Sequence, residues 1–225
     1  MAALARRLAD QRITSEAELL QRAAAGALEQ IIGAESSGIV LVGGTGPRTA
    51  AATSEIPKLL DSLQIAADEG PILQAVAEWY SHPIRVEDYA TEKRWPAYIV
   101  QAVTHTSVRS SLSFRLYRTG VAMGALTVYS GRPHAFTPEA EDIGVAIATH
   151  TAVALHFARR DIQFTSALAS RDVIGQAKGM IMERFRVDAL QAWNLLRVLS
   201  QNENTPVHVL ARQLIDAENL TSTSG

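Results

Sequence analysis

The chain has 225 residues, 47% of them hydrophobic, and a formal net charge of -2 at pH 7. This length suits one domain of medium size plus a small one, and the nearly balanced charge gives no general attraction to nucleic acid or to a membrane surface. The sequence has no cysteine, which excludes disulfides, thiolate metal sites and cysteine nucleophiles.

The first part of the chain alternates between helix and strand patterns. Its apolar spacing predicts helices over 15–32, 57–67 and 71–80 and strands near 38–42, 48–54 and 84–86. Gly33 can end the first helix, since glycine tolerates the left-handed backbone that often follows a helix. The run Gly43-Gly44-Thr45-Gly46 lacks the lysine of a phosphate-binding loop and predicts a hairpin turn instead.

Two longer strand patterns follow, over 109–117 and 121–129, and Arg118-Thr119-Gly120 separates them. Alternating side chains on both sides of a short turn are typical of paired antiparallel strands. Together with the earlier elements they predict an α+β fold, in which helices flank an antiparallel sheet.

One long helix is expected to join this domain to the last part of the chain, because no proline occurs between Pro138 and Phe185. Its most apolar run, 143–155, is interrupted by polar residues and is too short to cross a bilayer. The N-terminus has no signal-peptide pattern. We therefore expect a cytoplasmic protein that does not bind a membrane.

An apolar stripe with polar breaks runs along this long helix, because its members recur at steps of three or four. The stripe consists of Ile143, Ile147, His150, Ala154, Phe157, Phe164 and Leu168. It predicts a coiled-coil seam in a parallel homodimer. Alternatively, the stripe packs only on its own domain, which would account for the first half but would leave Phe164 and Leu168 unexplained.

The last part of the chain predicts three helices. An apolar face of the first carries Ile174, Ala177, Ile181 and Phe185. Arg171 and Lys178 are seven residues apart and lie on a different stripe, so one face can pack while another is left to bind.

The second and third of these helices have clear start signals. Asp188 can cap the second, with Gln191 reaching back to its amide. The buried side of the second helix is expected to hold Trp193, Leu196 and Leu199. Thr205 as cap and Pro206 at the first helical position indicate the third.

No catalytic arrangement is evident in the sequence. The six histidines, at 82, 105, 134, 150, 156 and 208, lack the spacing of a metal site. Ser110-Ser111 lies within a strand pattern rather than on a sharp turn, unlike the nucleophile of a serine hydrolase. We therefore expect neither a metal site nor an enzyme.

The segment 15–157 resembles a GAF domain, a small-molecule sensing fold related to PAS domains. The resemblance rests on Glu69-Gly70-Pro71, Asp88, Arg94-Trp95-Pro96, Val108-Arg109-Ser110, Gly124-Ala125-Leu126-Thr127-Val128-Tyr129 and Phe136-Thr137. After Gly-Pro, where such sensors frequently have cysteine, this chain has Ile72, which argues against a thiol-based redox sensor or a covalent bilin sensor. The cofactor stays unknown, because GAF domains host cyclic nucleotides, haem, small metabolites or nothing.

Four residues of this segment are candidate ligand contacts: Asp88, Arg94, Trp95 and Arg109. Each also has a structural interpretation. Trp95 at a helix start could fill the core. Asp88 and Arg94 could form a salt bridge across a loop, and Arg109 could anchor a ligand carboxylate or take part in that pairing.

The last quarter, about 158–220, resembles the ANTAR domain, a three-helix RNA-binding module of bacterial transcription antiterminators. The match is carried by Arg171, Ile174, Ala177-Lys178-Gly179-Met180-Ile181-Met182, Ala192-Trp193, Leu196-Arg197, Ser200, Asn204, Ala211 and Ile215. It implies binding to paired small stem-loops in nascent RNA, which prevents a terminator hairpin from forming. This organisation leaves 1–14 as an N-terminal extension and 221–225 as a tail.

The resemblance and the residue types together predict a set of RNA contacts. They are Arg171, Lys178, Arg197, Ser200, Asn204 and Arg212. From Arg159 onward, cations and carboxylates nearly balance, so base stacking and loop shape should carry selectivity. Each cation could instead be a solvated surface charge, and Ser200 and Asn204 could merely satisfy the end of a helix.

We therefore expect a regulator in which a signal at the first domain changes helix register or dimer geometry, and with it the spacing of two RNA-binding surfaces. A dimeric sensor whose C-terminal helices bind another protein is the alternative. Ionic strength separates the two, because salt weakens RNA binding steeply. Duplex DNA is a weaker candidate, since Thr205-Pro206-Val207 gives no basic start to a recognition helix.

Overall fold

The computed structural model describes residues 15–44, 46–77, 82–118 and 121–222, without the side chains of 117–118, 121–123, 161–167 and 218–222. Its contacts divide the chain into two units, residues 1–159 and 160–225, and each is described by itself. The predicted extension, 1–14, and residues 223–225 of the predicted tail lie outside the described residues.

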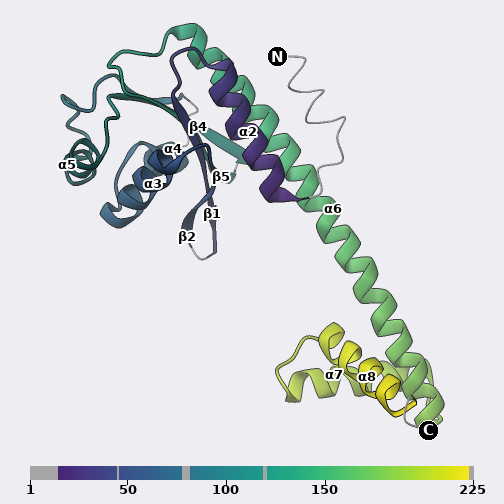
Figure 1. The fold of residues 1–225 in the computed structure, drawn as a ribbon. Helices are drawn as coiled ribbons and strands as arrows, with labels where there is room; N and C mark the ends of the chain where they lie inside the picture. Colours follow the sequence, from purple (N-terminus) through teal and green to yellow (C-terminus); the bar gives the residue numbers. More distant parts are fainter. Residues whose placement is uncertain (1–14, 45, 78–81, 119–120, 223–225) are drawn as a thin grey trace. The chain divides into compact units, whose positions relative to one another are not determined.

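A five-stranded antiparallel sheet forms the centre of the first unit (Figure 1). Its strands are β1 (Ser36–Gly43), β2 (Gly46–Ala52), β3 (Ile84–Val86), β4 (Ser110–Arg118) and β5 (Val121–Ser130). Their order is β2-β1-β5-β4-β3, and every neighbouring pair is antiparallel. The α+β prediction and both predicted hairpins are confirmed.

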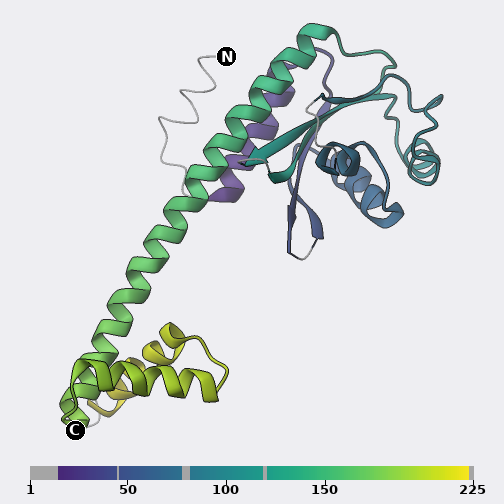
Figure 2. The ribbon, with the colours of Figure 1, turned by 180° about the vertical axis from the view of Figure 1, so that it is seen from behind.

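Helix α2 (Glu16–Gln30) and the first part of α6 (Pro138–Phe185) cover one face of the sheet (Figures 1 and 2). Ser15 begins α2, because its hydroxyl accepts the Glu18 N–H at 3.2 Å. The Arg159 guanidinium donates to both carboxylate oxygens of Glu16, at 2.7 and 2.9 Å. This bidentate ion pair fastens α6 to α2 at the end of the first unit.

Three helices, α3 (Glu55–Ala67), α4 (Pro71–Ala77) and α5 (Pro96–His105), cover the opposite face. Between them and the sheet lies a second core, rich in large side chains such as Leu60, Tyr89 and Tyr98. The Tyr89 hydroxyl bonds both the Tyr98 hydroxyl, at 3.2 Å, and the Ser111 hydroxyl, at 3.0 Å. The sheet is therefore buried on both sides, and this second core is partly polar.

Helix α6 is continuous over 48 residues, which confirms the predicted join. In its first part, Ile147 is fully buried in the core beneath α2, and Ile143 and Ala154 pack partly against that core. Ile147 is therefore not available to a dimer seam, whereas Ile143 and Ala154 are covered only in part, and the seam itself stays a prediction. The intradomain alternative accounts for this half of the stripe.

The rest of the predicted stripe differs from its first half. His150 is exposed, as are Phe157 (56% exposed) and Leu168 (46%). The side chain of Phe164 lies outside the described residues. Two valines that the prediction omitted, Val145 and Val153, are also exposed on α6, so the accessible apolar surface follows a different line from the predicted stripe.

The second unit packs the end of α6 against α7 (Ala189–Asn202) and α8 (Val207–Ser222). Its core consists of Val173, Ala177, Ile181, Ala192, Leu196 and Ala211. The predicted capping box is confirmed: Asp188 accepts from the amides of Leu190 and Gln191, and Gln191 accepts the Asp188 N–H. Helix α8 follows Pro206 as predicted, but the Thr205 hydroxyl donates to the Glu203 carbonyl, at 3.1 Å.

Three predictions for the core of this unit need correction. Leu199 is 38% exposed and Phe185 is 63% exposed, whereas both were expected to be buried. Phe185 ends α6, beyond the stretch that packs on α7 and α8, and Arg186 leaves the helix with a φ of 52°. Trp193 is half-buried, and Ala192 occupies the centre of the interface in its place.

Among the described helices, we find none with the length and apolar character that a membrane span requires.

Candidate nucleic-acid interface

A hollow of about 600 Å³ lies on the second unit, between α6 and α7. It is lined by Ser170, Arg171, Ile174, Gly175, Lys178 and Trp193. Two of the predicted RNA-contact residues, Arg171 and Lys178, thus meet in one concave surface. They do so because their spacing of seven residues is nearly two helical turns, which places both on the same side of α6.

Gly175 and Trp193 give the hollow its form. Apart from its chain neighbours and the nearby backbone of α6 itself, nothing in the described structure lies within 4 Å of where a Cβ on Gly175 would stand, so this turn of α6 leaves open space. Trp193 is held at the edge of α7, because the next-door Ala192 is fully buried in the core. The indole therefore lines the hollow while remaining partly fixed by packing.

The chemistry of the lining fits an anionic aromatic ligand. None of the six lining residues is acidic, so nothing in the hollow opposes the two cations. Arginine and lysine neutralise phosphates, and an indole face is a strong partner for a stacked base. Lys178 is half-buried and Arg171 is exposed, so both charged groups stay accessible to a ligand.

The other predicted RNA contacts lie elsewhere in the unit. The Ser200 hydroxyl donates to the Thr205 carbonyl at 2.6 Å, and Asn204 adopts a φ of 48° in the turn between α7 and α8. The helix-end interpretation therefore describes Ser200, whereas for Asn204 the structure shows its place in the turn and a backbone N–H bond to the Gln201 carbonyl. Arg197 is exposed on α7, outside the hollow, and Arg212 lines a separate hollow beside α8.

Trp193 was missed as a candidate contact because apolar spacing assigned it to the buried side of its helix. A stripe of period 3.6 indicates which side of a helix faces the core, but it does not separate the centre of that side from its edge. Two signals could have identified it: the small Ala192 beside it, and the glycine of the facing helix, Gly175.

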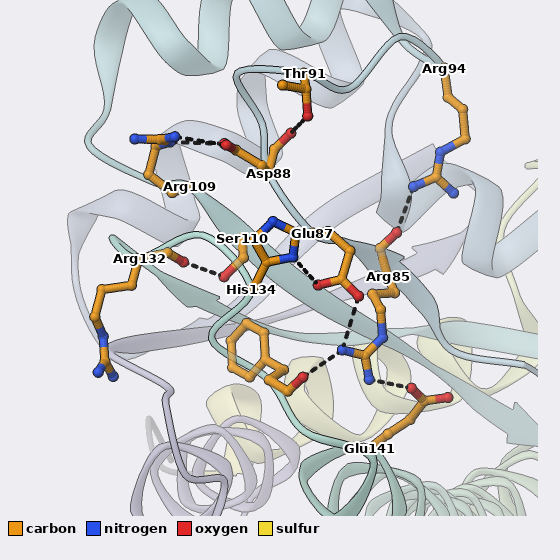
Figure 3. A network of polar contacts seen from close by, with 11 residues as sticks. Arg85, Glu87, Asp88, Thr91, Arg94, Arg109, Ser110, Arg132, His134 and Glu141 are labelled. Carbon is orange, nitrogen blue, oxygen red and sulfur yellow. Dashed lines mark hydrogen bonds and ion pairs between the residues drawn. The ribbon is translucent and has the colours of Figure 1, made fainter.

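The candidate ligand contacts of the first unit are occupied by one another and by neighbours (Figure 3). Arg109 donates to both carboxylate oxygens of Asp88, at 2.8 and 2.7 Å. This guanidinium holds the pKa of the Asp88 carboxyl well below its usual range, at about 2, and the Ala90 N–H contributes. The interpretation that pairs Asp88 with Arg94 is therefore wrong, whereas the one in which Arg109 takes part in the pairing describes the structure.

Arg94 and Trp95 form a separate structural group. Arg94 donates to the Glu92 carboxylate. It also donates to the Arg85 carbonyl, at 2.5 Å (Figure 3). Its guanidinium stacks over the Trp95 ring, with the Arg94 Cζ 4.4 Å from the ring centroid. Trp95 is buried in the second core, so its core-filling interpretation describes it.

The Glu69-Gly70-Pro71 motif also has a structural role. The Glu69 carboxylate accepts the N–H groups of Ala97 and Tyr98, at 2.7 and 3.3 Å, and so caps the start of α5. Gly70 has a φ of 141°, and a Cβ there would overlap the side chain of Gln64. That side chain accepts the Ile72 N–H at 2.8 Å, which fixes the start of α4.

A polar network ties β3 to the start of α6 (Figure 3). Arg85 donates to the Phe136 carbonyl and to the Glu141 carboxylate, both at 2.6 Å. One carboxylate oxygen of Glu87 lies 3.5 Å from Nη1 of Arg85, and the other lies 3.3 Å from Nδ1 of His134. The first turn of α6 is thereby held to the strand from which the Asp88 loop departs.

Comparisons with known proteins agree with the two units. The model of the GAF domain family matches residues 13–156, and that of the ANTAR domain matches residues 163–215. No curated protein matched the chain. ANTAR and GAF domains together support a GAF-regulated ANTAR regulator in general.

Solved structures show the same fold in the first unit. The GAF domain of a phosphoenolpyruvate-protein phosphotransferase from Acinetobacter is 16% identical, with a TM-score of 0.55 over 71% of this chain and 94% of its own. The corresponding GAF domain from Coxiella burnetii is 17% identical, with a TM-score of 0.54 over 71% and 95%. With 144 of its 225 residues, counted from 13 to 156, matched by one family model, the chain belongs to the GAF domain family and carries an ANTAR domain after its GAF domain.

Proposed function

We propose that the protein is a transcription antitermination regulator that binds small stem-loops of nascent RNA through its ANTAR domain, under the control of its GAF domain. The observation that supports this most is the hollow formed by Arg171, Lys178 and Trp193, which joins two cations to an aromatic face with no acidic neighbour in its lining. Loop nucleotides with unstacked bases offer the matching phosphates and rings.

The double substitution of Arg171→Ala and Lys178→Ala is expected to weaken binding to a tandem stem-loop RNA about 10- to 100-fold, because each charge-assisted contact is lost from the ligand. The measurement is a fluorescence titration of labelled RNA at fixed salt. Arg184→Ala is the matched control, since Arg184 is an exposed cation on α6 outside the hollow. If the double variant binds the RNA as tightly as the natural chain, the proposed RNA-binding surface is wrong.

A protein partner at the C-terminal helices is the competing function, and one observation favours it. Helix α7 exposes the apolar residues Leu190, Leu195, Val198 and Leu199. A salt series on the same titration distinguishes the two functions. The logarithm of the RNA affinity falls linearly with the logarithm of the salt concentration, whereas the affinity of an apolar helix interface changes little. The double variant should also show a shallower slope than the natural chain.

We infer that the active form is a homodimer, in which a small-molecule signal at the GAF domain changes the arrangement of two α6 helices. Support comes from the apolar residues that α6 exposes, Val145, Val153 and Phe157, which the sheet and α2 leave uncovered. Their spacing of eight and four residues keeps them near one side of the helix.

The joint substitution of Val153→Asp and Phe157→Asp is expected to convert the dimer into monomer at micromolar concentration, because paired carboxylates cannot be buried at such a seam. Analytical ultracentrifugation measures the change. Val100→Asp, at an exposed position of α5, is the control and should leave the sedimentation coefficient unaltered. A natural chain that sediments as a monomer would exclude the dimer.

A further inference from the structure

A second hollow, of about 290 Å³, lies beside the first one on the same unit, between α6 and α8. Its polar lining comes from Ser170, His208, Arg212 and Gln213. Its apolar part comes from Ala169, Val173 and Val209. Ser170 lines both hollows. The two therefore meet on α6, one on the α7 side and the other on the α8 side.

The lining of the second hollow follows from the way α8 packs. Leu210 and Ala211 are buried in the core of the unit, so the residues around them stand at the edge of the interface. His208 and Arg212 are one helical turn apart, with Gln213 beside Arg212, and all three side chains are exposed. Val173 is buried and forms a fixed apolar surface at the other side of the hollow.

The chemistry of the second hollow repeats that of the first with different groups. Again no lining residue is acidic. The imidazole and the amide can each donate and accept hydrogen bonds, which suits the edge of a base, and the arginine suits a phosphate. Its volume is close to the lower end of the range of small-molecule sites, about 300–1,000 Å³.

We propose that the second hollow is a further nucleotide-binding site, which takes a second nucleotide of the same RNA loop. Its base lies on Val173 and Val209, the His208 and Gln213 side chains bond its edge, and Arg212 contacts the adjoining phosphate. This inference rests on the proposed function, because it requires an RNA strand that already occupies the hollow of Lys178 and passes Ser170.

The experiment combines protein variants with altered RNA. The full chain with His208→Ala and Gln213→Ala is titrated against stem-loops in which each loop nucleotide in turn is replaced by an abasic residue. We expect the double variant to bind the unmodified RNA about tenfold more weakly than the natural chain. At one loop position, the abasic RNA should bind both proteins equally, since the contact is already absent.

Controls separate this inference from the function on which it rests. Gln201→Ala, at an exposed position of α7 outside both hollows, should bind like the natural chain. Thermal unfolding verifies that each variant is folded. If Arg171→Ala with Lys178→Ala weakens binding but the His208 and Gln213 pair does not, the second site is overturned and the function stands. The second site is also overturned if the His208 and Gln213 double variant weakens the binding of every abasic RNA by the same factor. If neither double variant changes affinity, the RNA-binding function itself fails.

Discussion

Replacing Asp61 by asparagine is expected to raise the free energy of unfolding at pH 8 by roughly 2–4 kcal/mol and to leave it nearly unchanged at pH 4. Asp61 is 1% exposed on α3. Its Oδ2 accepts the Thr49 hydroxyl at 2.8 Å, but among the described residues Oδ1 has no hydrogen-bond partner. Burial raises the pKa of this carboxyl to about 7 from 3.8, although the hydroxyls of Thr49 and Tyr129 lower it in part.

The direction of the effect follows from where the proton is bound. Between about pH 4 and pH 7 the unfolded chain has lost the Asp61 proton while the folded chain keeps it, so folding takes up a proton. Stability therefore falls as the pH rises through this window, and above pH 7 the folded state holds a buried charge. Asparagine has nearly the same shape and never acquires that charge.

Urea unfolding at pH 4.5, 6 and 8 measures this difference. The gap between the variant and the natural chain should grow from the lowest to the highest pH. Asp142→Asn removes an exposed carboxylate of α6 and is the matched control, for which we expect no such gap. If Asp61→Asn lowered stability equally at all three values, the carboxylate would have a stabilising partner in the fold, contrary to the argument.

The second large effect is expected at Gly124, where alanine should lower the free energy of unfolding by about 3 kcal/mol or more. Gly124 lies opposite Leu41, where β5 pairs with β1. A Cβ on Gly124 would overlap the carbonyl oxygen of Val40. Because that atom belongs to the backbone of the neighbouring strand, the two strands must separate to accept it, and both lie inside the sheet.

Gly43→Ala provides the comparison, since Gly43 is also a strand glycine but has nothing within 4 Å of its added Cβ. It should change stability by less than about 1 kcal/mol. Thermal and urea unfolding of both variants measure the contrast. Equal effects at the two positions would mean that backbone flexibility, rather than the close approach of β1 and β5, explains the need for glycine at 124.

Local patterns in the sequence predicted the elements of this fold well. The alternation on both sides of a short turn placed β4 and β5, and the absence of proline placed the whole of α6. Asp188 and Gln191 were correctly paired, because a capping box depends only on residues three positions apart.

Contacts between distant parts of the chain were beyond these patterns. Arg109 pairs with Asp88, 21 positions away, and Arg85 pairs with Glu141, 56 positions away. Many carboxylates lie within reach of any arginine in a folded chain, so spacing does not select one. Similarly, heptad spacing on α6 left two partners open for Ile147, a second copy of the helix or its own domain, since periodicity fixes a face but not its partner. The structure places Ile147 in the core of its own domain.

The Glu69 cap leaves the opening amides of α5 less available to an anion. A phosphorylated or carboxylated compound often gains affinity by placing its charge at the amides that open a helix. At α5, two of these amides are already taken by an internal carboxylate, at 2.7 and 3.3 Å. An anionic metabolite would have to displace Glu69 and meet its repulsion, whereas a neutral or cationic one would encounter no such competition there.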